Sequence, residues 1–394
     1  MTLAHDVTES IRIARVITRL NIGGPSRHVM TLTSALNDGR FRSRLICGIP
    51  TPNEGDLTAE ARAGGYPLVQ IRALRNDAGL IAALATMQTL YREFRTMRPH
   101  IVHLHQFKAR FLGALAARAA GVPHVVQTYH GTLLQGYFLP PLATAVTLLE
   151  RLLGRWLVHH TIAISPEVCR QLVERGMVDP HRITVIRLGL SLTPLLTPPE
   201  SGDAFRREID IPTDALLIGF VGRLAPIKGA DLFLEAAEEL IRTMERPVYA
   251  VIVGDGPERQ HLEAQARRAA IDSRIIFTGW RRDLRAVYWG IDVLAVTSRS
   301  EGTPVVAMEA MAARRAVVAT RVGGIPDIIQ DGRTGLLIEP GNPQRLAAAL
   351  QQVLEDVALR QRLGLAAQQS VYPAYDETTL CRAMREYYAR LLEG

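Results

Sequence analysis

Short runs rich in β-branched residues alternate with longer amphipathic stretches along the whole chain, and this alternation limits the possible folds more than any other feature. In the first half, buried strands are predicted at 12–18, 100–105, 124–130 and 159–165, each followed by a helical pattern. The second half repeats the pattern with "LLIGFVGRL", "VYAVIVGDG", "RIIFTGW", "DVLAVTS", "AVVAT" and "TGLLIEP". Such alternation predicts parallel sheets covered on both faces by helices, so we expect an α/β fold.

The chain has 394 residues, enough for two or three domains. The segment "SLTPLLTPPESGD" at 191–203 has the composition of a linker. We therefore predict two doubly wound, Rossmann-like domains facing across a central cleft, at 1–195 and 203–370. The residues 371–394 are predicted to form a C-terminal helix that packs back on the first domain. Ligands of such sheets bind beyond the carboxyl ends of the strands, so the loops after strands are the places to search.

Charge is unevenly distributed between the two halves. Residues 1–195 hold 22 Lys and Arg against 12 Asp and Glu, whereas the remainder holds 24 against 27. A basic half suits an anionic lipid surface or a phosphorylated acceptor, although an arginine-rich composition spread over solvated faces explains it equally well. Nucleic acid is not expected as a partner, because no basic run is interleaved with aromatic residues.

Targeting features point to the cytoplasm. No apolar stretch of about 18 residues predicts a membrane-spanning helix, and the opening residues "MTLAHDVTES" lack the pattern of a signal peptide. The three cysteines, Cys47, Cys169 and Cys381, are too few and too scattered for a disulfide framework or a zinc site. We expect a reducing compartment.

Two post-strand loops have the composition of phosphate-binding sites. Gly23 and Gly24 follow the first strand and would let an anion approach the backbone at a helix start, although a plain tight turn is an equal interpretation. In "GRLAPIKG", Arg223 and Lys228 offer a guanidinium fork and a point charge that together suit a diphosphate. Lys228 is one of only two lysines in the chain.

The segment "SRSEGTPVVAMEAMA" combines a helix start with two glutamates. Thr303 is a plausible N-cap and Pro304 fits the first helical turn, so the helix would present free N–H groups to an anion. Glu301 precedes this helix start. Glu309 lies within an apolar helix and needs hydrogen-bond donors, for which ribose hydroxyls or an arginine from another element are the candidates.

His130 ends a predicted strand, and His103 and His105 end another, so one of the latter pair should face the ligand side. A structural histidine is the common alternative. With no cysteine partner and no H-E-x-x-H motif, we expect no metal site. The chain also lacks the Asp-x-Asp motif, which usually binds the divalent ion that accompanies a nucleotide diphosphate.

These motifs together make the second domain resemble the family 4 retaining glycosyltransferases of GT-B fold. The resemblance rests on "GRLAPIKGADLFLEA", "VIVGDGPER", "IIFTGW", "SEGTPVVAMEAMA" and the segment from "VVATRVGG" to "GLLIEPGN", supported more weakly by "GGPSRHV" and "TYHG". One departure is Arg314-Arg315-Ala316, where the family often has Gly-x-Pro.

The resemblance implies a role for each matched residue. Glu309 would hold the ribose of the donor and Glu301 would meet the donor sugar. Arg223 and Lys228 would bind the diphosphate and stabilise it as it leaves, while the backbone at Gly23 and Gly24 approaches the same phosphates. His130 would lie beside the reacting sugar. The helix start contributes further nucleotide contacts from Gly302, Thr303, Pro304 and Val305. No metal ion and no cofactor are expected.

The resemblance thus implies a retaining, metal-independent glycosyltransferase that moves a sugar from a nucleoside diphosphate sugar to an acceptor hydroxyl. UDP with an N-acetylhexosamine is favoured on family grounds, with a GDP-sugar next, in cell-surface polysaccharide or glycolipid biosynthesis. The alternatives are a sugar-nucleotide 2-epimerase of the same fold, a retaining phosphorylase, and a non-catalytic sugar-nucleotide-binding subunit.

The acceptor is expected on the first domain, as a sugar or a lipid-linked sugar. The stretch "GYFLPPLATAVTLLERLLGRWLVHH" at 136–160 is apolar with Arg151 and Arg155, yet it is too short and too proline-broken to span a bilayer. We expect peripheral contact with the inner face of the membrane, or else burial of this stretch as an ordinary core helix.

Overall fold

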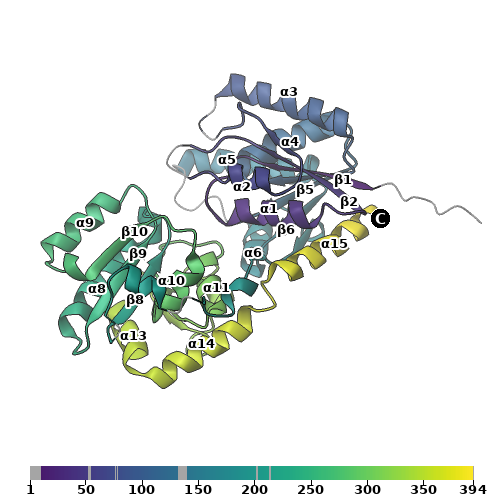
Figure 1. The fold of residues 1–394 in the computed structure, drawn as a ribbon. Coiled ribbons are helices and arrows are strands. Elements are labelled where there is room, and N and C mark those ends of the chain that lie inside the picture. The colour runs from purple at the N-terminus through teal and green to yellow at the C-terminus, as the bar shows by residue number, and fades with distance from the viewer. Residues whose placement is uncertain are drawn as a thin grey trace, which may run out of the picture. The chain divides into compact units, whose positions relative to one another are not determined.

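The computed structural model describes residues 10–51, 55–75, 77, 79–131, 140–200, 203–212 and 214–393, with side chains for all of these except 140–146 and 153. The chain forms two compact units. Unit 1 comprises Met1–Gly189 and Glu377–Gly394, and unit 2 comprises Leu190–Asp376. Each unit contains one parallel sheet with helices packed around it (Figure 1).

Unit 1 has a seven-stranded sheet in the order β3-β2-β1-β4-β5-β6-β7. The pairings between neighbouring strands are parallel. The order reverses between β1 and β4, which makes the ends of these strands the topological switch point where ligands of such sheets bind. The strands are β1 (Ile11–Ile17), β2 (Phe41–Cys47), β3 (Leu68–Gln70), β4 (Ile101–His105), β5 (His124–Tyr129), β6 (His160–Ala163) and β7 (Ile183–Val185).

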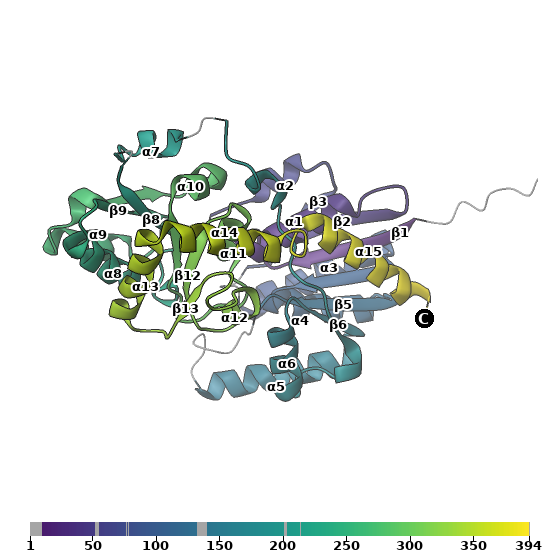
Figure 2. The same ribbon diagram turned by 90° about the horizontal axis from the view of Figure 1, so that it is seen from below.

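Strand alternation divides the unit 1 core between two faces of the sheet. Val16, Val102 and Val125 pack with α3 (Leu80–Met97) and α4 (Phe107–Ala119). Ile13, Ile101 and Val126 pack on the other face with α1 (Gly24–Ala35) and α15 (Glu377–Glu393). Figure 2 shows α15 crossing in front of this sheet. The remaining helices are α2 (Thr58–Ala63), α5 (Pro140–Trp156) and α6 (Pro166–Glu174).

Unit 2 has a six-stranded sheet in the order β10-β9-β8-β11-β12-β13, again with parallel pairings. Here the order reverses between β8 and β11, so the loops that follow these two strands meet at the switch point. The strands are β8 (Leu216–Val221), β9 (Val248–Val253), β10 (Ile275–Gly279), β11 (Val293–Val296), β12 (Ala316–Thr320) and β13 (Leu336–Ile338).

The main core of unit 2 lies between the sheet and four helices. These are α8 (Ala230–Thr243), α9 (Arg259–Arg268), α13 (Pro343–Glu355) and α14 (Val357–Val371). α11 (Val305–Ala312) contacts β11, β12 and α14. The short helices are α7 (Ala204–Glu208), α10 (Leu284–Gly290) and α12 (Ile325–Ile328).

The predicted α/β class and the doubly wound sheets are confirmed, and the ten predicted strands all form. The sequence prediction missed β2, β3 and β7. β2 alternates polar and apolar residues, and β3 and β7 have only three residues each, so none of them shows a continuous apolar run. Within the part of the chain that the structure describes, no helix is long and apolar enough to cross a membrane.

Candidate functional site

Gly23 and Gly24 lie directly after β1, at the switch point of unit 1. Gly23 caps α1, which begins at Gly24, and its backbone is extended, with φ 169°. A Cβ at Gly23 would meet Asn21 and Pro25 only at ordinary contact distances of 3.8 and 3.9 Å. The fold itself therefore does not demand glycine at this position.

His130 follows β5 and contacts two other histidines. Its Nε2 lies 3.0 Å from Nδ1 of His105, at the end of β4. His28, on α1, packs against both, with ring centroids 5.0 Å from His130 and 5.9 Å from His105. We call His28, His105 and His130 the histidine cluster. Neither His28 nor His105 is exposed, and His130 is half-buried.

Further polar residues lie next to the histidine cluster on the same face of the sheet, and we call them the polar strip. His103 stacks on His105 with ring centroids 4.3 Å apart. Its Nδ1 lies 2.6 Å from the hydroxyl of Tyr388 on α15, and its Nε2 lies 2.7 Å from Oγ1 of Thr128. Because residues two apart on a strand share a face, His103 and His105 lie on the side covered by α1 and α15. The strip is therefore closed by a helix from the far end of the chain.

The fully buried guanidinium of Arg15 lies at the end of this strip. It donates hydrogen bonds to Ser43 and Tyr388, and no carboxylate pairs with it among the described residues. Burial, assisted by the charge of Arg15, lowers the pKa of His28 to about 3. Burial likewise holds the pKa of His103, His105 and His130 well below the usual value. All four imidazoles are neutral at physiological pH.

A buried ion pair anchors the strand that carries His130. Arg110 on α4 donates to Glu150 on α5, and Tyr129, which directly precedes His130, donates its hydroxyl to the same carboxylate. The guanidinium also lies 3.7 Å from the centroid of the Tyr129 ring. Because burial opposes ionisation, the pKa of Tyr129 is raised and the residue remains a hydrogen-bond donor. This network fixes the end of β5.

In unit 2, Arg223 and Lys228 lie in the loop after β8. Arg223 is exposed and makes no side-chain hydrogen bond or ion pair with any described residue. The Nζ of Lys228 lies 2.6 Å from Oε2 of Glu301. Gly229, at φ +66°, allows the loop to lie against the end of β11, since a Cβ would lie 2.2 Å from the carbonyl oxygen of Thr297. The hydroxyl of Thr297 donates to the Gly229 carbonyl at 2.7 Å.

Glu301 lies in the loop after β11 and is held from three sides. Its Oε2 accepts from Lys228 and, at 2.9 Å, from the hydroxyl of Ser298. The Glu301 carbonyl accepts from the N–H of Gly324 at 3.0 Å. A Cβ at Gly323, which has φ +51°, would lie 1.9 Å from that carbonyl oxygen. The glycine pair of "RVGGIP" thus allows the Glu301 loop to pack closely, and it places the carboxylate beside Lys228.

The helix start after Glu301 differs from the predicted geometry. The N-cap of α11 is Pro304 and not Thr303. No side chain accepts a hydrogen bond from the first N–H groups of this helix. The predicted N-cap role of Thr303 is therefore wrong. Because the chain turns into the helix one residue later, at Val305, the Thr303 hydroxyl is buried without a hydrogen-bond partner among the described residues.

Glu309 lies on the second turn of α11 and is half-buried. The hydroxyl of Tyr288 on α10, which is fully buried, donates to Oε2 of Glu309 at 2.7 Å. One donor to this carboxylate is thus a tyrosine from another element, which was not among the candidates that the sequence offered. This contact orients the carboxylate.

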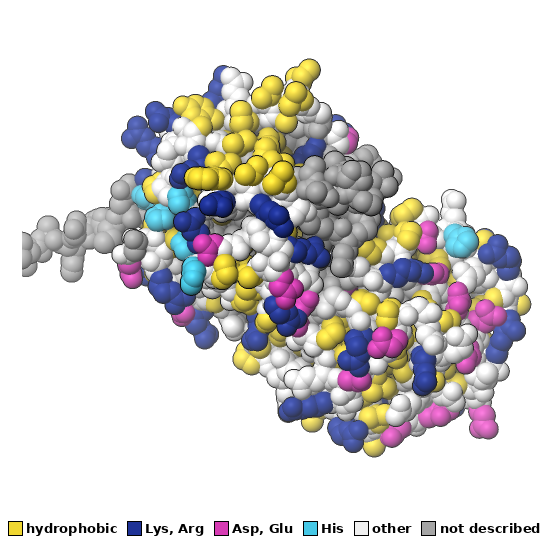
Figure 3. Space-filling model, turned by 180° about the vertical axis from the view of Figure 1, so that it is seen from behind, with side chains coloured by type: hydrophobic (Ala, Val, Ile, Leu, Met, Phe, Trp, Pro, Cys, Tyr) yellow, Lys and Arg dark blue, Asp and Glu magenta, His cyan; other side chains and the backbone are white. Residues whose placement is uncertain are grey.

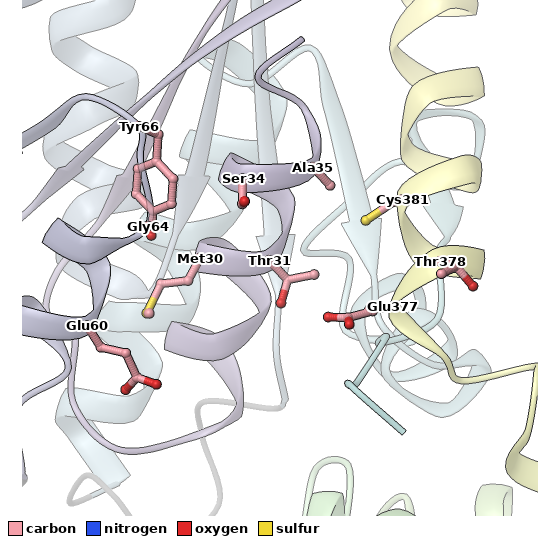
Figure 4. A pocket seen from close by; sticks show the side chains of 10 residues that line it. All are labelled: Met30, Thr31, Ser34, Ala35, Glu60, Gly64, Tyr66, Glu377, Thr378 and Cys381. Atoms are coloured by element: carbon pink, nitrogen blue, oxygen red, sulfur yellow. The ribbon is translucent and has the colours of Figure 1, made fainter. Parts of the chain in front are cut away.

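A groove of about 500 Å³ lies elsewhere on unit 1, between α1, α2 and α15 (Figure 4). It contains none of the residues that the sequence predicted for the site. Its lining residues are Met30, Thr31, Ser34, Ala35, Glu60, Gly64, Tyr66, Glu377, Thr378 and Cys381.

Sequence reasoning did not find His28, Arg15, Tyr288 or Tyr388. His28 stands four residues after Gly24 and could have been noted as a residue of the first helical turns. The role of Tyr388 had no local signal, since it lies 285 residues from His103 in the chain.

Two family models match this chain. The Glycosyltransferase Family 4 model matches residues 22–193, and the Glycosyl transferases group 1 model matches residues 215–356. Between them they include the predicted site residues of both units.

The named relatives are also glycosyltransferases. A D-inositol 3-phosphate glycosyltransferase of Corynebacterium diphtheriae is 30% identical over 300 residues, which are 73% of this chain and 70% of the relative. The UDP-Gal:alpha-D-GlcNAc-diphosphoundecaprenol alpha-1,3-galactosyltransferase of Escherichia coli is 27% identical over 351 residues, 89% of each chain. HepE of Anabaena, solved in complex with UDP and glucose, has a TM-score of 0.82 at 21% identity, with 96% of this chain and 100% of HepE covered, a likeness of fold.

The chain belongs to the group 1, family 4 glycosyltransferases and has their GT-B fold. It is therefore an enzyme that transfers a sugar from an activated donor, in which the sugar is linked to a nucleotide or a lipid. The predicted family, fold and enzyme class are confirmed.

Proposed function

We propose that this enzyme transfers a hexosyl or N-acetylhexosaminyl group from a nucleoside diphosphate sugar to an acceptor hydroxyl, with retention at the anomeric carbon and without a metal ion. A UDP-sugar is the favoured donor and a GDP-sugar the next candidate. The product would enter cell-surface polysaccharide or glycolipid biosynthesis. The name of the Escherichia coli relative specifies UDP-Gal, and the HepE structure contains UDP, which supports the choice of base.

The Lys228–Glu301 pair at the switch point of unit 2 is the observation that carries this proposal. The two charged groups, 2.6 Å apart, lie at the ends of neighbouring strands with the exposed Arg223 in the same loop. In our proposal the donor diphosphate accepts hydrogen bonds from Lys228 and Arg223, and the start of α11 adds backbone N–H groups. Neutralising charge at the departing phosphate lowers the barrier to cleavage of the sugar–phosphate bond. Lys228 and Arg223 would thus neutralise the charge of the diphosphate, which a divalent ion neutralises in other enzymes.

Glu309 and Glu301 receive different roles in this proposal. Glu309, oriented by Tyr288, accepts hydrogen bonds from the two ribose hydroxyls, while Glu301 meets the donor sugar. His130 lies beside the reacting sugar, and the backbone at Gly23 and Gly24 approaches the phosphates. The acceptor hydroxyl attacks on the face that the diphosphate leaves, and a leaving phosphate oxygen takes its proton.

Isothermal titration of UDP, GDP and ADP into the purified protein with EDTA tests the donor site. We expect one base to bind, and Glu309→Ala to weaken that nucleotide by at least about 1.4 kcal/mol, a factor of ten. Glu239→Ala, an exposed glutamate of α8, is the matched control and should leave the affinity unchanged. Absence of nucleotide binding, or equal binding by the Glu309 variant, would contradict the proposal.

The reaction itself is tested by incubating the enzyme with the sugar nucleotide that binds and with candidate acceptors, in EDTA. NMR of the product should show the anomeric configuration of the donor. A 2-epimerase would instead release an isomer without any acceptor, and a binding subunit would turn nothing over.

The acceptor is proposed to be lipid-linked and to be reached from a membrane surface. On α5, Leu148, Leu152 and Trp156 are 58%, 49% and 66% exposed. Their spacing of four residues places them along one helix face. The exposed Arg151 and Arg155 lie on the same helix and suit anionic headgroups. The described part of α5 is thus not an ordinary core helix, and the name of the Escherichia coli relative specifies a diphosphoundecaprenol acceptor.

A second apolar patch gives a matched control for this idea. Apolar side chains also gather over α3 (Figure 3), where Leu80, Ile81 and Leu84 are exposed. We expect the enzyme to float with phosphatidylglycerol vesicles at low salt and less at high salt. Replacing the three apolar residues of α5 with serine should remove most of this binding. Loss of binding only on replacing those of α3 would place the membrane contact there instead.

A further inference from the structure

The histidine cluster has the geometry of a metal site. One ring nitrogen from each of the three residues lies within 4.8 Å of the others, and His105 Nδ1 and His130 Nε2 are already 3.0 Å apart. Tetrahedral zinc with metal–nitrogen bonds of about 2.05 Å requires its nitrogens about 3.3 Å apart and its imidazole centres about 5 Å apart. The ring centroids here lie 5.0, 5.3 and 5.9 Å apart.

The cluster also contains buried ring nitrogens that lack partners. Both nitrogens of His28, and Nε2 of His105, are buried without a hydrogen-bond partner among the described residues. His28 is only 1% exposed. Buried polar groups are almost always hydrogen-bonded, so an imidazole with neither nitrogen satisfied points to a missing ligand. A cation that binds nitrogen lone pairs satisfies it directly.

The donor set selects the kind of ion. Three imidazoles, with neither carboxylate nor thiolate among them, suit Zn²⁺, Co²⁺, Ni²⁺ or Cu²⁺ and not Mg²⁺ or Ca²⁺. Three protein ligands leave a fourth position for water, and His130 is the member of the cluster that reaches solvent. The charge of Arg15 acts on His28 and His105 and opposes a cation, so the affinity should be lower than that of a closed four-ligand zinc site.

We propose that His28, His105 and His130 bind one divalent ion of the zinc class and that this ion inhibits sugar transfer by occupying His130. The ion takes no part in the transfer chemistry, which is proposed to need no metal. The inhibition rests on the role proposed for His130 beside the reacting sugar, whereas the binding of the ion does not.

Cobalt binding provides the direct test, using the full-length chain without added histidines after removal of metals. We expect one Co²⁺ per chain with the visible absorption of tetrahedral cobalt, displaced by Zn²⁺ and not by Mg²⁺. His28→Gln and His130→Gln should each raise the cobalt Kd at least tenfold. The control is His124→Gln with His159→Gln, which removes a histidine pair in ring contact outside the cluster, and it should bind as the parent does. Circular dichroism checks that each variant is folded.

The outcomes separate the site from its effect. No cobalt binding, or binding that only the control substitutions abolish, would overturn the site. Binding that follows His28 and His130, together with inhibition of transfer by Zn²⁺ that increasing sugar nucleotide relieves, supports the proposal in full. Binding without inhibition keeps the site but overturns its effect, and would show that His130 does not lie beside the reacting sugar. Nucleotide titration in EDTA reports on the donor site independently of these results.

Discussion

The two units place their polar site residues in opposite surroundings. In unit 1 the imidazoles of His28, His103 and His105 and the guanidinium of Arg15 are buried, His130 beside them is half-buried, and α15 covers them through Tyr388. In unit 2 the charges lie in loops, where Lys228 and Glu301 neutralise each other and Arg223 is exposed. Buried neutral groups make folding sensitive to protons, whereas paired charges in loops must change partners when a charged ligand arrives.

The largest expected effect is acid destabilisation confined to unit 1. His28, His103, His105 and His130 have folded-state pKa values below the usual 6.5, so the unfolded chain binds more protons below that pH. Stability is therefore full above pH 6.5 and is lost as pH falls. Each histidine contributes up to about 1.4 kcal/mol between pH 7.5 and 5.5, and the four together contribute up to about 5.5 kcal/mol.

Hydrogen exchange in EDTA, corrected for intrinsic rates, measures this effect for each sheet separately. Protection of β4 and β5 should fall on acidification far more than that of β8 and β11. His28→Leu should reduce the pH dependence, because it deletes one of the buried imidazoles whose pKa is lowered. Equal loss of protection in both sheets would contradict the expected difference in acid sensitivity between the two units.

Next in size is the effect of separating the charged pair of unit 2. Lys228→Met and Glu301→Gln should each lower kcat/KM about 10²- to 10³-fold, the cost of removing one charge-stabilising group. They should differ in nucleotide binding. Lys228→Met weakens it, while Glu301→Gln leaves it equal or tighter because Lys228 is released to the diphosphate. Titration and initial rates measure both, with Glu263→Gln, which removes a half-buried pair with Arg259, as the control.

A smaller effect is expected from matched tyrosines in the two units. Tyr288→Phe removes the hydrogen bond that orients Glu309 and should weaken nucleotide binding by about 1 kcal/mol, roughly fivefold. Tyr388→Phe removes the contact with His103 and should leave nucleotide affinity unchanged. Equal effects of the two substitutions in calorimetry would mean that the hydrogen bond from Tyr288 to Glu309 has no special part in nucleotide binding.

The smallest expected effect concerns the backbone of unit 2. Arg314 follows α11 with φ +57°, a left-handed conformation that costs a non-glycine residue about 1 kcal/mol. Arg314→Gly should stabilise the protein by about 0.5–1 kcal/mol in urea unfolding. Arg315→Gly is the contrast, because Arg315 stacks on Trp289 and its loss should destabilise. A less stable Arg314→Gly protein would show that the contact of Arg314 with Gln368 outweighs the strain.

The sequence by itself determined the parallel α/β class, the positions of ten strands and the loops that carry Gly23, Arg223, Lys228 and Glu301. These inferences succeed because a buried parallel strand is a continuous apolar run, and because the residues after such a strand are fixed at the edge of the sheet. The helix start at Pro304 was predicted one residue early, since capping depends on a single backbone turn that composition does not specify.

Only the tertiary structure decided which side chains meet. The order of strands brings His105 and His130 together, and the packing of α1 and α15 adds His28 and Tyr388 from distant parts of the chain. A donor to Glu309 likewise comes from another element, since Tyr288 lies on α10. The physical reason is that alternation along a strand assigns a residue to a face of the sheet, while what covers that face depends on the path of the whole chain.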